Sequence, residues 1–191
     1  MGDEGRSVAT DLDGNVYVTG SFNSTIDFDP GPGVTSRDAA AGIYSAFCSK
    51  FDQGGNFIWV DTWGGEDDCV AGSVETDQSG NLCVTGSFRG IADLDPGPDL
   101  YERGLAHRYS QFISLFDSSG ELKWAHIWTL PMDYYADSLS LDSFGNVYIT
   151  GWFDETEDFD PTSSIDSHTA TPGPSDYSYD DAYLIKLLSI E

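Results

Sequence analysis

Short apolar runs separated by glycine- and aspartate-rich turns extend along the whole chain. Segments such as 16–19 and 82–85 are apolar on one face and mixed on the other, which favours strands covered by neighbouring sheets. No segment carries apolar residues at helical spacing. Because the runs are rich in Val, Tyr, Phe, Trp and Thr, the pattern predicts an all-β protein.

The pattern occurs three times. The segment SVATDLDGNVYVTGSF at 7–22 returns as SVETDQSGNLCVTGSF at 73–88 and as SLSLDSFGNVYITGWF at 138–153, with spacings of 66 and 65 residues. A second block, 46–63, aligns with 111–128 and places four of the five tryptophans at repeated positions. Fixed periods of this kind are typical of repeat proteins. We therefore expect one repeat domain over residues 1–191, with units at about 5–70, 71–135 and 136–191.

The turns predict two hairpins in each complete unit. In the motif D-x-x-G-N, aspartate accepts backbone N–H bonds and glycine takes the positive φ that closes a hairpin. The motif occurs at 11–15, 77–81 and 142–146, and a related D-x-x-G turn at 52–55 and 117–120. Each complete unit is thus expected to form four antiparallel strands, like a propeller blade, whereas the third unit lacks its final strand.

A long connection joins the second and third strands of each unit. These connections, at 23–44, 89–110 and 154–181, carry seven of the eight prolines and the motifs IDFDPGPG, ADLDPGPD and EDFDPTSS. Long loops on one edge of a rigid scaffold are where binding tends to occur.

The order of motifs resembles a known repeat family. D-x-x-G-N-V-Y-V-T-G-S-F at 11–22, D-F-D-P-G-P-G at 27–33, F-x-S-K-x-D-x-x-G-N-F-x-W at 47–59 and W-G-G at 63–65 are similar to the bacterial SBBP (seven-bladed β-propeller) repeats, whose pattern is distantly like that of NHL repeats. The resemblance implies a β-propeller within a larger secreted or cell-surface protein, without a shared catalytic activity. The third unit departs from the pattern, because it lacks Gly-Pro-Gly after Pro161.

Three units are too few to close a propeller, which typically needs four to eight blades. Either further blades come from the same longer chain, or two chains form a six-bladed homodimer. The missing final strand of the third unit favours the first alternative.

The strong negative charge argues against two classes of partner. Eight Lys and Arg against 33 Asp and Glu give a net charge of −25, which repels nucleic acid and anionic membrane surfaces. No apolar run is long enough to cross a membrane. The charge is consistent either with solubility or with cation binding. Three cysteines without metal-site spacing are expected to be packing residues, with a Cys48–Cys83 bridge as the alternative.

Pairs of aspartates in the long loops suggest a metal site. Residues i and i+2 of an extended segment point to the same side, so each D-x-D motif presents two carboxylates together. Their repulsion would be relieved by a hard cation such as Ca²⁺, which prefers oxygen ligands. In the other interpretation, these side chains cap a turn and are solvated. The candidate calcium ligands are Asp27, Asp29, Asp93, Asp95, Asp158 and Asp160.

The sequence therefore predicts a non-catalytic binding or structural scaffold. His107, His126 and His168 occupy no repeated position, and no hydrolase or phosphate-binding motif occurs. One alternative is the scaffold part of a larger propeller hydrolase or dehydrogenase. The other is a glycan-binding adhesin that uses the aromatic side chains of Trp152, Tyr134, Tyr135, Tyr177 and Tyr179.

Overall fold

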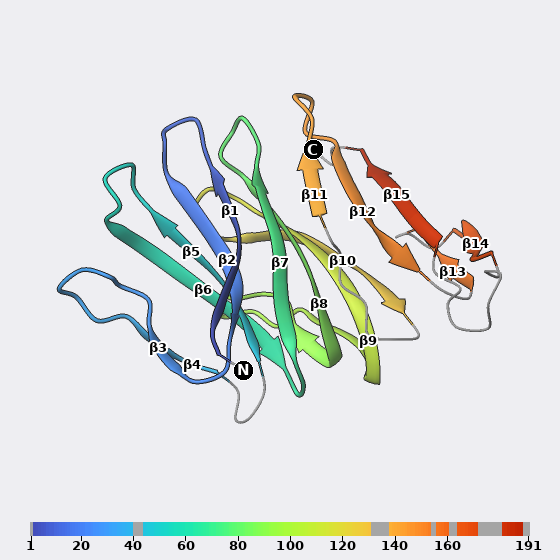
Figure 1. The fold of residues 1–191 in the computed structure, drawn as a ribbon, viewed down its shortest axis with the longest axis horizontal. Coiled ribbons are helices and arrows are strands. Elements are labelled where there is room, and N and C mark those ends of the chain that lie inside the picture. Colours follow the sequence, from blue (N-terminus) through green and yellow to red (C-terminus); the bar gives the residue numbers. More distant parts are fainter. Residues whose placement is uncertain are drawn as a thin grey trace.

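The computed structural model describes residues 2–39, 44–130, 138–153, 156–160, 164–171 and 181–188, and only the backbone of 106–108 and 129–130. Every regular element in this part of the chain is a β-strand, which confirms the all-β prediction. Figure 1 shows three groups of strands side by side in chain order. No helix within the described ranges is long and apolar enough to cross a membrane.

Each group of strands corresponds to one sequence unit and is called a blade below. Blade 1 pairs β1 (Glu4–Thr10), β2 (Val16–Phe22), β5 (Ser45–Phe51) and β6 (Phe57–Gly65) in antiparallel order. Blade 2 does the same with β7 (Cys69–Thr76), β8 (Leu82–Asp93), β9 (Glu102–Phe116) and β10 (Leu122–Leu130). Blade 3 contains three described strands, β11 (Ser138–Leu141), β12 (Val147–Phe153) and β15 (Asp181–Leu187).

The tight turns form as the sequence predicts. Asp77 Oδ1 accepts the N–H groups of Ser79 and Asn81 at 2.8 Å each, and Asp77 Oδ2 accepts the Asn81 amide at 2.7 Å. Asp11 and Asp142 make the equivalent bonds in blades 1 and 3. The turn glycine has a φ of 77–79° in all three copies, a conformation that other residues rarely adopt.

The described parts of the long connections contain short hairpins. In blade 1, β3 (Thr25–Asp27) pairs with β4 (Ser36–Asp38), and in blade 3, β13 (Thr156–Asp158) pairs with β14 (Ser167–Thr169). In blade 2 the hairpin is continuous with β8 and β9. It also pairs with the end of β6 through Gly64 and Gly65, so blades 1 and 2 share one hydrogen-bonded sheet.

Side chains of the final strands join neighbouring blades. The ring of Trp63, on β6, lies 6.3 Å from that of Phe112 and 5.7 Å from that of Phe116, both on β9. Trp128, on β10, lies in the core of blade 3 and its indole N–H donates to the carbonyl of Phe159 at 3.4 Å. The repeated tryptophans are therefore inter-blade contacts.

The cysteines are packing residues, as the sequence predicts. Cys48, Cys69 and Cys83 are all buried free thiols, and Cys48 lies in the cluster between blades 1 and 2. Burial in apolar surroundings raises the pKa of the Cys69 thiol to about 12, so this thiol stays protonated and unreactive at neutral pH.

Candidate functional site

The three long-loop hairpins share one hydrogen-bond pattern. In the second hairpin, Asp93 Oδ1 accepts the N–H groups of Asp95 at 3.1 Å and Tyr101 at 2.9 Å, and the N–H of Leu94 donates to the Tyr101 carbonyl at 3.2 Å. The first aspartate of each motif thus accepts hydrogen bonds from the backbone N–H groups of the residues two and eight positions further along the chain. Asp27 binds Asp29 and Thr35 in the first hairpin in the same way.

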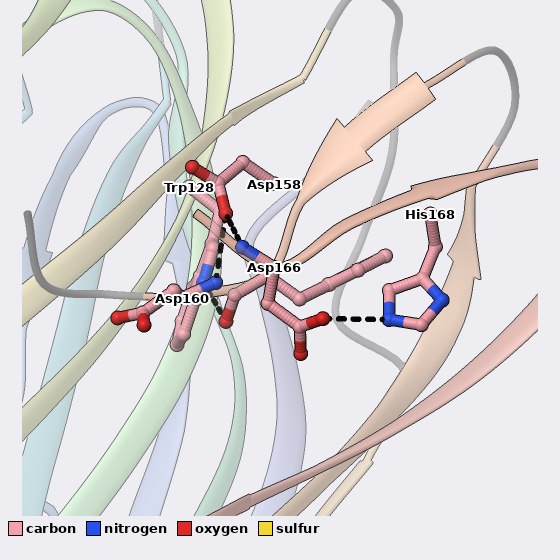
Figure 2. A network of polar contacts seen from close by, with 6 residues as sticks. Trp128, Asp158, Asp160, Asp166 and His168 are labelled. Carbon is pink, nitrogen blue, oxygen red and sulfur yellow. Dashed lines mark hydrogen bonds and ion pairs between the residues drawn. The ribbon is translucent and has the colours of Figure 1, made fainter. Parts of the chain in front are cut away.

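Figure 2 shows the same arrangement in the third hairpin. Asp158 Oδ1 accepts the N–H groups of Asp160 at 3.1 Å and Asp166 at 2.8 Å, and Trp128 donates to the neighbouring Phe159 carbonyl. The pattern therefore forms even where the Gly-Pro-Gly sequence is missing. What the three loops need is the first aspartate, because one of its oxygens closes the hairpin.

In the first two hairpins, the second aspartate of the motif shows why glycine follows proline. Asp29 Oδ1 accepts the N–H of Gly31 at 2.8 Å, and Asp95 Oδ1 accepts that of Gly97 at 2.8 Å. A Cβ atom on Gly97 would lie 2.9 Å from Asp95 Oδ1, closer than real Cβ atoms approach. The D-P-G segment is thus a compact side-chain-capped turn.

The six predicted calcium ligands lie in three separate hairpins, two in each. Within the described residues, no group of three or more His, Cys, Asp or Glu side chains is placed to hold a metal ion. The first aspartate of each pair uses an oxygen for backbone N–H groups, as in the turn-capping interpretation. Calcium binding stays a prediction, and it would have to use the remaining oxygens.

Substitutions of Asp93 distinguish its turn-capping hydrogen bonds from its negative charge, which calcium binding would need. Asparagine keeps a side-chain oxygen that accepts N–H bonds, so Asp93→Asn is expected to change the free energy of unfolding by less than about 0.5 kcal/mol, whereas Asp93→Ala is expected to cost about 1–2 kcal/mol. Urea unfolding measures both values. Equal losses in the two variants would contradict the capping role.

A thermal melt in EDTA, then with CaCl₂ or MgCl₂ at matched ionic strength, tests the calcium prediction. Calcium bound to the native state at a hundredfold excess over Kd would stabilise the protein by about 2.7 kcal/mol. The calcium prediction requires a selective rise in Tm that disappears in Asp27→Asn/Asp93→Asn, because both variants keep the cap but lose the charge. A melt unchanged by calcium would contradict it.

Each hairpin holds one apolar side chain inward. Leu94 is fully buried in the core of blades 1 and 2. Phe28 and Phe159 occupy the same position and contact Phe22 and Phe153 edge-on, with ring centroids 5.3 and 5.0 Å apart. In the second hairpin, the hydroxyl of Tyr101 also donates to the Ala125 carbonyl of β10 at 3.0 Å. These contacts fix the hairpins on the edge of the blades.

Each hairpin also holds one apolar side chain outward. The residue seven positions after the first aspartate is exposed by 78% in Val34, 77% in Leu100 and 80% in Ile165. Sequence analysis missed these residues, although the aligned copies carry a branched aliphatic residue at this position in every unit. Isolated apolar residues on a surface are common, but an exposed one at the same loop position in all three units points to an interaction surface.

The aromatic residues named for glycan binding and the three histidines lie in different parts of the fold. Trp152 lies half-buried on β12, and Tyr134, Tyr135, Tyr177 and Tyr179 lie outside the described residues. His168 is exposed and pairs with Asp166 at 3.0 Å on the third hairpin (Figure 2). The ring of His126 lies 5.1 Å from that of Trp124 on β10 in a tilted arrangement, and desolvation lowers the pKa of His126. The side chain of His107 lies outside the described part.

Asp61, on β6, is a titratable group whose burial couples pH to stability. Burial raises its pKa to about 6 from the ordinary 3.8; Arg37 in the first hairpin partly opposes this rise, and Asp95 in the second adds to it. The folded state therefore holds this proton more tightly than the unfolded state. The contribution of Asp61 to stability falls as pH rises from about 4 to 6 and is constant above that range.

We expect Asp61→Asn to stabilise the protein at pH 7.5, because the buried charge is removed. Two pKa units correspond to about 3 kcal/mol, and partial exposure reduces the expected gain to about 1–2 kcal/mol. At pH 5, still above the sequence pI of 4.1, the gain is expected to fall by about half. Urea unfolding of both proteins at the two pH values measures it, and a gain independent of pH would contradict this assignment.

Comparison with known proteins agrees with this geometry. Residues 2–27, which include β1, β2 and β3, match the family model described as SBBP, beta-propeller repeat. The chain is also similar to an uncharacterized WD repeat-containing protein of Acanthamoeba polyphaga mimivirus, with 24% identity over 194 residues. The similar region takes in 87% of this chain and 14% of that protein, so the chain spans a small part of its relative's length.

These comparisons, together with the blades, make the chain a repeat scaffold. Its seven-bladed and bacterial character stays a prediction. It is an all-β protein with the sheets of a partial β-propeller, and its residues 2–27 match the SBBP β-propeller repeat model.

Proposed function

We propose that the chain is a non-catalytic binding scaffold that contacts a protein partner through the three hairpin tips, at the cell surface or outside the cell. The observation that carries the proposal is the exposed aliphatic residue at the tip of every hairpin, Val34, Leu100 and Ile165. Each is held beside a hairpin closed by aspartate–backbone hydrogen bonds, so little conformational entropy is lost when a partner binds.

The composition of the tips favours a protein partner. Aliphatic side chains gain free energy when a partner surface covers them, whereas sugars are usually bound by stacking on aromatic rings. The aspartates around the tips would select a partner with a basic rim. Repetition of one contact in three units also supports multivalent binding to a scaffold, because a catalytic site is usually a single constellation.

A matched set of variants tests the proposal. The triple variant Val34→Ser/Leu100→Ser/Ile165→Ser removes the tip side chains, and Leu12→Ser removes an equally exposed aliphatic residue from a tight turn. Both are expected to keep the wild-type Tm within about 2 °C, because exposed substitutions rarely change stability. Proteins chemically crosslinked to the chain on intact host cells are expected to be lost with the triple variant and retained with Leu12→Ser.

Two other outcomes would contradict the proposal. Crosslinking that is unchanged in the triple variant would remove the tips from the interface. Glycan-array binding that disappears in Trp152→Ala would instead support the adhesin alternative. The location is tested separately by fractionating host cells, where recovery of the chain only in the cytosol would contradict a role at the surface.

A further inference from the structure

Two interfaces inside the molecule define how blades of this repeat pack. In the first, Tyr17, Cys48 and Trp63 of blade 1 pack against β7, β8 and β9 of blade 2. In the second, Cys83, Ile113 and Trp128 of blade 2 pack against β11, β12 and β15 of blade 3. Blades 2 and 3 thus each receive a final-strand tryptophan on one face, called the leading face, and blades 1 and 2 each supply one from the opposite, trailing face.

Among the described residues, no other blade covers the leading face of blade 1. Val8 is exposed by 64%, whereas the aligned residues Val74 and Leu139 are exposed by 1% and 4% because another blade covers them. Val18 pairs with Val8 across β1 and β2 and is half-buried, while its counterpart Val84 is fully buried. The apolar residues of an inter-blade core are therefore present on this face without their partner.

A groove lies on this face at the place where a tryptophan is bound in the other blades. Its volume is about 330 Å³. Phe47 and Phe51 line it, and they align with Phe112 and Phe116, the two rings that Trp63 contacts in blade 2. Phe28 also lines the groove and aligns with Phe159, whose carbonyl accepts the indole N–H of Trp128. The groove thus repeats two observed tryptophan sites.

We propose that the groove binds the final-strand tryptophan of another blade of this repeat. The occupant is a blade with a complete fourth strand, because both observed interfaces use a tryptophan from that strand. The described part of blade 3 pairs no strand with the outer edge of β15, so an unmodified second copy would leave the groove without its tryptophan. This inference rests on blade packing and is independent of the proposed function of the hairpin tips.

The test compares the full chain with a lengthened chain, in which residues 1–187 are followed by a copy of 117–130. The copy continues the alignment of β15 with β9 and supplies blade 3 with a fourth strand and its tryptophan. Sedimentation equilibrium in 0.5 M NaCl, which screens the repulsion between the acidic chains, is expected to give twice the monomer mass, as for a six-bladed ring. Its dissociation constant is expected to be at least about tenfold lower than that of the unmodified chain.

Two variants of the lengthened chain locate the contact. Val8→Asp places a charge on the leading face and is expected to restore the monomer, whereas Leu12→Asp adds the same charge in an exposed turn and is expected to leave the dimer intact. Changing the second tryptophan of the added strand to alanine is expected to weaken the dimer as Val8→Asp does. Circular dichroism melts confirm that each variant is folded.

Three results would overturn the proposal. The first is a lengthened chain that melts cooperatively but stays monomeric at about 100 µM, where even a weak specific interface is populated. The second is a dimer that forms equally well with Val8→Asp. The third is an unmodified chain that dimerises as tightly as the lengthened one, because the occupant would then be a second copy without the tryptophan strand.

Discussion

Trp128→Ala is expected to reduce the free energy of unfolding by about 3–5 kcal/mol, the range for removing a buried aromatic side chain. Trp128 is buried between blades 2 and 3, where it joins the core formed by Leu139, Ile149 and Tyr183. Its removal leaves a cavity in the side-chain core between these blades and leaves the Phe159 carbonyl without its indole donor.

We expect Trp128→Ala to destabilise blade 3 before it destabilises the rest of the protein. Repeat proteins are stabilised by interfaces between neighbouring units, so blade 3 is expected to unfold first while blades 1 and 2 stay together. Hydrogen exchange followed by mass spectrometry is expected to show lower protection in β11, β12 and β15, with little change in β1 and β2. Urea unfolding gives the total loss.

Trp152→Ala is the matched control, because it removes the same side chain from a half-buried position in blade 3. Its cost is expected to be clearly smaller, since less apolar area is lost from the core. If the two variants lost equal stability, or if protection fell evenly over all blades, Trp128 would not be the specific link between blades 2 and 3.

The turns and strands could be predicted because their causes are local. Asp77, Gly80 and Asn81 form a hairpin from interactions within five residues, and the structure repeats this at every D-x-x-G-N motif. The position of the repeated tryptophans was also evident from the alignment. Their packing on the following blade was not, because it depends on how separate sheets stack.

The roles of the loop aspartates needed the structure. The alternation of side chains in an extended strand led us to expect both carboxylates of a D-x-D pair on one side, ready for a cation. The structure adds that the backbone turns after Asp93 and that one oxygen of its carboxylate accepts the N–H of Tyr101, eight residues away, while calcium binding stays a prediction. Sequence spacing cannot show such a contact, because it depends on the return of the second hairpin strand.

The exposed residues at the hairpin tips were missed for a different reason. Val34, Leu100 and Ile165 lie in the long connections, where the sequence alone does not show whether an apolar side chain is buried or exposed. Only the observed hydrogen bonds on either side show that the chain is held with these side chains outward. The signal was their repetition, which a core assignment explains equally well until burial is known.

Gly86→Ala is the second substitution for which we expect a large loss, about 3 kcal/mol or more, because a close backbone contact leaves no room for a side chain. A Cβ atom at this position would overlap the carbonyl oxygen of Val70 on β7 and would lie 2.8 Å from the ring of Phe112. The overlap with Val70 involves backbone, so it can be relieved only by moving β7 away from β8.

Two other glycines make this prediction specific. Gly5→Ala is expected to be nearly neutral, because its Cβ atom would lie 3.7 Å from Val18 Cγ1, an ordinary contact. Gly151 aligns with Gly86, but the closest contact of its Cβ atom would be 2.6 Å from the hydroxyl of Tyr183, which belongs to a side chain and not to the backbone of a paired strand. Gly151→Ala is therefore expected to lower the stability less than Gly86→Ala, although both residues occupy the same position of the repeat.

Thermal melts of the three variants measure this order. Equal losses of stability for Gly86→Ala and Gly151→Ala would show that the repeat position, and not the backbone contact, sets the loss.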